Sequence, residues 1–194
     1  IPGLMMLSVM TTSVNFAAFG IYLPKYNGSI FELMSAPISA YEIVIGYAGA
    51  AASKSILISI LILLTSTIFV DFNIKHPLLM LLLLAITSIT FSLFGFIIGI
   101  WATNFEKLQL IPLIIITPLV FLGGSFYSIS MLPELWQLVT KFNPIFYIIN
   151  GFRWSFFGTS DIDLFTSLSL IMIFLFICLA IIGLIFKTGY RIKG

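Results

Sequence analysis

Few side chains in this sequence could carry out chemistry. The chain has one histidine, His76, and one cysteine, Cys178, so it offers no set of imidazole and thiol ligands for a metal. His76 lies in a short polar loop, where exposure is the simpler interpretation, and Cys178 lies in an apolar run. The motifs H-E-x-x-H, G-x-S-x-G and G-x-x-x-x-G-K-[ST] are all missing. We therefore expect no catalytic site in this chain, and no metal or cofactor bound by it.

The elements that carry these residues are mostly apolar. The composition is 60% hydrophobic and 8% charged, whereas soluble domains carry about 25% charged residues. A chain with so few charges cannot cover itself in water, so lipid must be its main solvent. The net charge of +2 is small and scattered, which gives no reason to expect a nucleic acid partner.

Five apolar runs alternate with polar segments. They cover about 1–23, 44–70, 77–102, 109–127 and 164–186. A bilayer core of about 30 Å takes roughly 20 helical residues, and a helix satisfies its own backbone groups in lipid. The short alternating segments of membrane barrels are absent. The sequence thus predicts one all-α domain over 1–194, a polytopic transmembrane helical bundle.

The basic residues indicate which side each loop occupies. Lys187, Arg191 and Lys193 form the densest basic cluster, and basic clusters favour the cytoplasm. We therefore place the C-terminus in the cytoplasm. Counting back through the spans puts the loop at Glu106 inside and the loop at Asp161 outside.

A short segment at about 29–37 lies between the first two runs, on the predicted cytoplasmic side. Ser29 followed by Glu32 is a capping-box pattern, and Pro37 would stop the helix. Such a helix could dock on a partner protein. A plain interfacial turn fits the same residues, and both interpretations stay open here.

The second apolar run contains a lysine and several small residues. Lys54 lies about a third of the way along, where a charge is costly unless it snorkels or faces an aqueous cavity. Snorkelling is the simpler interpretation. Gly46 with Ala50, and Gly49 with Ser53, predict a face on which helices approach closely.

The fourth run is the most distorted. Pro112 and Pro118 remove backbone donors and predict a kink, and Gly123 with Gly124 would end the helix. Broken helices at membrane depth usually line a cavity. A lipid-facing kink without a role is the alternative.

The region at about 131–158 predicts a helical hairpin before the last span. A first helix carries an apolar stripe at helical spacing, expected to pack on the last two spans. The stripe comprises Leu132, Leu135, Trp136, Val139 and Phe142. A second helix, Ile145 to Phe157, would reach only about 20 Å and is too short to cross. We expect a re-entrant hairpin in the outer leaflet, with an interfacial helix pair as the alternative and Arg153 more simply an anchor than a ligand.

These residues resemble the ABC-2 family of permeases of bacterial exporters. The resemblance covers essentially the whole chain and is most specific in its second half. It rests on Phe121-Leu-Gly-Gly-x-Phe126-Tyr127, Leu132-Pro133-x-x-Trp136, Asn143-Pro144-x-x-Tyr147, Gly151-x-Arg153 and Gly158, and on Glu32-Leu-Met-x-x-Pro37.

The resemblance implies the permease subunit of an ATP-binding cassette exporter in the bacterial inner membrane. It implies six spans, about five of them present here. The run that starts at Ile1 is then expected to be a truncated second span, with sequence missing upstream. ATP and Mg would be used by a separate ATPase subunit, and a second permease copy, giving a homodimer, would complete the transporter.

The resemblance also implies roles for particular residues. Glu32, Leu33 and Pro37 would couple the permease to the ATPase subunit. The candidates for the pathway or its gate are Lys54, Pro118, Gly123, Gly124, Trp136, Asn143, Pro144, Tyr147 and Arg153. The alternatives are a secondary transporter driven by an ion gradient, for which Lys54 is the only midplane charge, or another polytopic membrane protein, such as a scaffold or a membrane-bound enzyme.

Overall fold

A computed structural model describes residues 1–70, 74–127, 129–159 and 162–189 of the chain. These residues form helices and connecting turns, with no strand among them. The elements are α1 (Pro2–Asn27), α2 (Ile30–Ser35), α3 (Ala40–Phe69), α4 (Pro77–Trp101), α5 (Phe105–Ile111), the π-helix η1 (Pro112–Ile116), α6 (Thr117–Leu122), the 3-10 helix η2 (Ile129–Met131), α7 (Glu134–Lys141), α8 (Pro144–Phe157) and α9 (Leu164–Thr188).

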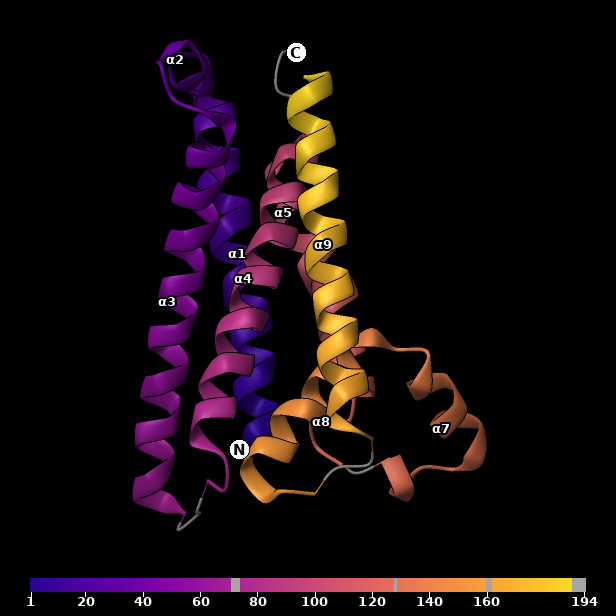
Figure 1. Ribbon diagram of the computed structural model, residues 1–194. Coiled ribbons are helices and arrows are strands. Elements are labelled where there is room, and N and C mark those ends of the chain that lie inside the picture. Colours follow the sequence, from indigo (N-terminus) through magenta and orange to yellow (C-terminus); the bar gives the residue numbers. More distant parts are fainter. Residues whose placement is uncertain (71–73, 128, 160–161, 190–194) are drawn as a thin grey trace.

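Within the described residues, five helical segments are long and apolar enough to cross a membrane. They are α1, α3, α4, the composite helix Phe105–Leu122 and α9. This confirms the predicted all-α bundle of membrane-spanning helices. The spans run roughly side by side, with α2 and the C-terminus at one end and the N-terminus, α7 and α8 at the other (Figure 1). The segments predicted to lie inside and outside are therefore at opposite ends.

The closest helix pair is α1 with α4. A Cβ atom added at Gly95 would lie 2.4 Å from the Val14 carbonyl oxygen, and one at Gly99 would lie 2.4 Å from that of Ala18. The backbones therefore touch where α4 carries glycine. Small residues permit this approach in lipid, where helices associate by packing and by polar contacts.

A chain of buried hydroxyl groups joins α3 to this pair. Ser13 Oγ on α1 lies 2.7 Å from Ser55 Oγ on α3, which lies 3.0 Å from Ser88 Oγ on α4. All three side chains are fully buried. Hydrogen bonds between helices stabilise membrane bundles modestly, so these contacts help to hold α1, α3 and α4 together.

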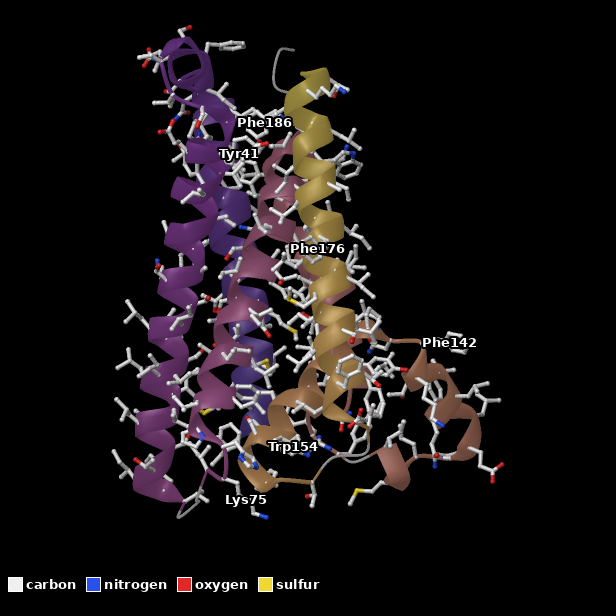
Figure 2. All side chains as sticks on the ribbon, viewed as in Figure 1. Tyr41, Lys75, Phe142, Trp154, Phe176 and Phe186 are labelled. Carbon is white, nitrogen blue, oxygen red and sulfur yellow. The ribbon has the colours of Figure 1, made fainter. Side chains whose placement is uncertain are left out.

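The close packing predicted at Gly46 and Gly49 is wrong within this chain. A Cβ atom at either glycine would meet nothing within 4 Å. The face of α3 that packs on α1 and α4 carries Ala48, Ala51 and Ser55 instead. Gly49 lines an apolar cavity of about 750 Å³ between α3 and α9. Tyr41, Phe176 and Phe186, which line the same cavity, are labelled in Figure 2.

The capping box predicted at the start of α2 is also wrong. Ser29 has helical backbone angles (φ −62°, ψ −14°) and makes no side-chain cap, whereas capping needs an extended residue. The box forms ten residues later, where Ser39 is extended and its Oγ accepts from the Glu42 amide. The Glu42 carboxylate accepts in turn from the Ser39 amide at 2.6 Å. The side chain of Glu32 is exposed and takes no part in a capping box.

The two helices of the predicted hairpin, α7 and α8, differ in their surroundings. Most side chains of α8 are buried, but α7 projects to the side of the bundle (Figure 1). Leu135 is 70% exposed, Trp136 47% and Phe142 82%. The prediction that this stripe packs on the last two spans is wrong for the single chain, because α7 mainly contacts η2 and α8.

Candidate functional site

The candidate residues lie in three places along the bundle. Glu32 and Pro37 are exposed beside α2 at the predicted cytoplasmic end. Lys54 lies in the middle of α3. Most of the remaining candidates lie where α6 meets the hairpin, at the opposite end of the bundle, whereas Trp136 lies apart from them on α7. The side chain of Leu33 lies outside the part of the chain that the structure describes.

Arg153 on α8 binds the turn that follows α6. Its Nη2 donates to the carbonyl oxygen of Gly124 and, at 3.2 Å, to that of Tyr127. Gly124 has φ +80°, in the left-handed region that glycine favours. Carbonyl groups beyond a helix end lack intrahelical partners, and the guanidinium supplies donors for them. These are the contacts of an anchor, the simpler of the two interpretations of Arg153.

Asn143 makes a second link between the same elements. Its Oδ1 accepts from the Ile145 amide at 3.0 Å and so caps α8. Its Nδ2 donates to the Leu119 carbonyl oxygen of α6 at 2.5 Å. Tyr147 on α8 also contacts the end of α7, where its hydroxyl donates to the Lys141 carbonyl oxygen at 2.8 Å.

Glycine is required where α6 and α8 touch. A Cβ atom at Gly123 would lie 2.9 Å from the Leu119 oxygen and 3.3 Å from the Phe146 amide nitrogen. Phe146 is in the first turn of α8, which begins at Pro144. Pro118 lies at the start of α6, directly after the π-helix. The structure thus brings together Gly123, Gly124, Asn143, Pro144 and Arg153 at one junction.

The other end of α8 is hydrogen-bonded to the loop before α4. Sequence reasoning missed this contact. The amide of His76 donates to the Ser155 oxygen at 3.0 Å, and that of Lys75 donates to the Phe156 oxygen at 3.2 Å. The His76 ring stacks on Trp154 with centroids 4.5 Å apart. Lys75 and Trp154 are both labelled at this end in Figure 2. The helix α8 is therefore held on two sides.

A partly polar pocket lies between α1 and the broken span, by which we mean the composite helix Phe105–Leu122. Its cavity volume is about 460 Å³, and η1 forms part of its wall. A π-helix inside an α-helix often occurs at a functional site. The lining residues are Thr11, Asn15, Phe19, Leu108, Gln109, Pro112, Leu113 and Thr117. Asn15 and Gln109 were not among the candidates, although single polar side chains within apolar runs could have indicated them.

Lys54 is nearer the middle of its helix than predicted. Since α3 runs from Ala40 to Phe69, about 21 Å of helix separates Lys54 from either end at 1.5 Å per residue. The Lys54 Nζ lies 3.3 Å from the centre of the Phe16 ring. Such a contact contributes about 2 kcal/mol when desolvated, below the roughly 3 kcal/mol that a central charge costs.

The comparison with known families decides the class of protein. Residues 1–157 match the model of the ABC-2 type transporter family. The chain belongs to the ABC-2 family. It is therefore a membrane transport permease, as the resemblance of its motifs implied.

Two relatives of this ABC-2 chain are similar to it over long stretches. The inner membrane transport permease YadH of Escherichia coli (strain K12) is 36% identical over 175 residues, covering 90% of this chain and 68% of YadH. Nodulation protein J of Sinorhizobium fredii (strain NBRC 101917 / NGR234) is 25% identical over 112 residues, 58% of this chain and 43% of that protein. The match to YadH includes the three groups of candidate residues described above.

Proposed function

We propose that this chain is the permease subunit of an ATP-binding cassette exporter in the bacterial inner membrane. A separate ATPase subunit would bind ATP and Mg, since this sequence contains no phosphate-binding loop. The observation that carries the proposal is the exposed α2 at one end of a bundle with a partly polar pocket at membrane depth. Membership of the family and the printed name of YadH support it.

The basic residues near the C-terminus indicate how the chain would be oriented in the membrane. In the structure α2 and the C-terminal end of α9 lie at the same end of the bundle (Figure 1). Lys187 lies in the last turn of α9, while Arg191 and Lys193 lie outside the described residues. Because basic residues favour the cytoplasmic side, the C-terminus and α2 would both be cytoplasmic, and α2 would face the ATPase subunit.

The end of α1 that leads into α2 is bound to the end of α4. Lys25, in the last turn of α1, donates from Nζ to the Ala102 carbonyl oxygen at 3.2 Å and to that of Ile100. The end of α1 is therefore tied to the end of α4. Only Gly28 and Ser29 separate α1 from α2, so movement of α2 would be passed to α1. A second permease copy, forming a homodimer, would enclose the exposed side of α1.

Glu32→Arg should uncouple the ATPase subunit from the permease. The carboxylate is exposed on α2, and charge reversal at an interface replaces attraction by repulsion. We expect ATP hydrolysis by the assembled transporter to fall by roughly fivefold or more, as a loss of about 1 kcal/mol implies. Membrane insertion should be unchanged. Normal ATP hydrolysis in a normally assembled complex would show that Glu32 does not contribute to the contact between α2 and the ATPase subunit.

Asp163→Arg is the matched control. Asp163 is also exposed and precedes α9 at the opposite end of the bundle. The same change of charge there should leave ATP hydrolysis unaltered.

A further inference from the structure

The loop before α4 supplies hydrogen bonds that the last turn of α8 lacks. A helix leaves the carbonyl groups of its last turn without intrahelical donors, and Ser155 and Phe156 lie in that turn. The amide of His76 donates to the first carbonyl oxygen at 3.0 Å, and the amide of Lys75 donates to the second at 3.2 Å. His76 directly precedes the first residue of α4. The negative end of the α8 dipole therefore meets the positive end of the α4 dipole.

The ring of His76 makes this contact specific to one side of α8. Main-chain hydrogen bonds do not depend on side-chain type, whereas stacked rings require two particular residues to face each other. The imidazole stacks on the Trp154 indole with centroids 4.5 Å apart and planes 9° from parallel. The stack lies at the end of the bundle opposite α2, where Trp154 is labelled (Figures 1 and 2). It fixes the rotation of α8 about its own axis.

The residue before Trp154 uses that rotation on another side of the helix. Arg153 donates to the carbonyl oxygens of Gly124 and Tyr127 in the turn after α6. Successive residues of an α-helix point about 100° apart, so Arg153 and Trp154 face different neighbours. The last turn of α8 thus lies between the loop before α4 and the turn after α6. A rotation of α8 that breaks the stack would also carry Arg153 away from its two carbonyl groups.

We propose that His76 is a positioning residue, which acts through Trp154 to hold Arg153 against the turn after α6. The contacts of His76 described above are with α8, so its effect on that turn is indirect. Asn143 and Pro144, at the start of the same helix, are candidates for the pathway or its gate. His76 would therefore set the resting position of the gate. This last step rests on the proposed function, whereas the positioning of Arg153 does not.

Hydrogen exchange of the purified permease, followed by mass spectrometry, tests the positioning role. The amides of Gly123 and Gly124 donate to the carbonyl oxygens of Leu119 and Phe121, and local opening of the turn exposes them to exchange. In His76→Ala these two amides should exchange roughly fivefold faster, as the loss of one aromatic pair implies. A role confined to the loop would speed exchange in the loop alone.

Two further variants show whether the ring stack carries the effect. His76→Phe keeps a flat ring and removes the ionisable group, so it should restore slow exchange at Gly123 and Gly124. Tyr26→Ala is the matched control, because it removes a stack on Tyr22, with centroids 6.0 Å apart, at the other end of the bundle. It should leave the turn after α6 unchanged. Unchanged exchange in His76→Ala, or no rescue by His76→Phe, would overturn the positioning role.

Leakage from proteoliposomes tests the step from position to gate. In the absence of ATP, a small fluorescent dye trapped with the permease should escape roughly fivefold faster through His76→Ala than through the parent. His76→Phe should retain the dye as the parent does. Faster exchange without faster leakage would overturn the assignment to the gate and leave the positioning role intact. Neither measurement needs an ATPase subunit, so a permease that assembles with none would count against the proposed function alone.

Discussion

Replacing Gly95 by leucine should prevent the bundle from folding. Even the first side-chain atom would lie 2.4 Å from the Val14 carbonyl oxygen and 2.7 Å from the Val14 Cα. These are backbone atoms of α1 and cannot rotate away. Overpacking of a core costs about 3 kcal/mol at the upper end of its usual range, which lowers the ratio of folded to unfolded protein roughly a hundredfold.

Size-exclusion chromatography of a fluorescent fusion measures this loss directly. Gly46→Leu is the matched control, because a side chain at Gly46 meets nothing within 4 Å. The control should elute as a single sharp peak, and Gly95→Leu should aggregate or disappear. A sharp peak of normal height from Gly95→Leu would show that α1 and α4 are not in backbone contact.

Arg153→Ala should release the hairpin of α7 and α8 from the turn that follows α6. The change removes the donors to the carbonyl oxygens of Gly124 and Tyr127. Hydrogen bonds from a charged group contribute about 1.5–3 kcal/mol each, so we expect a loss of about 3 kcal/mol for the pair. Arg153→Lys should recover part of the loss, because an ammonium group can donate but lacks the planar fork.

Thermal unfolding and proteolysis of the detergent-solubilised protein both report this change. Lys141→Ala is the control, since Lys141 is an exposed basic residue on the same hairpin. It should leave both measurements unchanged. If Arg153→Ala were as stable and as protease-resistant as the parent, the anchoring role of Arg153 would be wrong. The placement of Trp136 and Tyr147 in a gate stays a prediction.

The spans could be predicted because their signal is local and long. About 20 consecutive apolar residues specify a membrane helix whatever the neighbouring helices do. The distortion of the fourth run also followed from its own residues, since the π-helix that the structure shows begins at Pro112 and ends two residues before Pro118. The direction in which each helix faces is a tertiary property, and there the sequence was a poorer guide.

Two pairs of similar motifs show this limit. Ser29 with Glu32 and Ser39 with Glu42 have the same spacing, but only Ser39 has the extended backbone that a cap requires. The small residues around Gly46 looked suited to close packing, yet the backbone contact forms at Gly95 and Gly99. Sequence spacing alone does not say which small-residue face meets another helix.

Sequence reasoning found only part of the candidate site, again because the fold decides which side chains meet. Asn143 and Arg153 stood out by type within an aromatic helix and its turn, but their partners, on α6 and in the turn that follows it, are distant in sequence. Asn15 and Gln109 were passed over because one polar residue in an apolar run carries little weight alone. Only the folded chain places them on one pocket.

Site-specific photo-crosslinking tests most directly whether α2 docks on a cytoplasmic ATPase subunit. A photoreactive residue would replace Phe31, which is 55% exposed on α2, or Phe142, which is 82% exposed after α7 at the other end. The account predicts a crosslink to the ATPase subunit from position 31 and none from position 142. A crosslink from position 142, or none from position 31 in an active transporter, would contradict it.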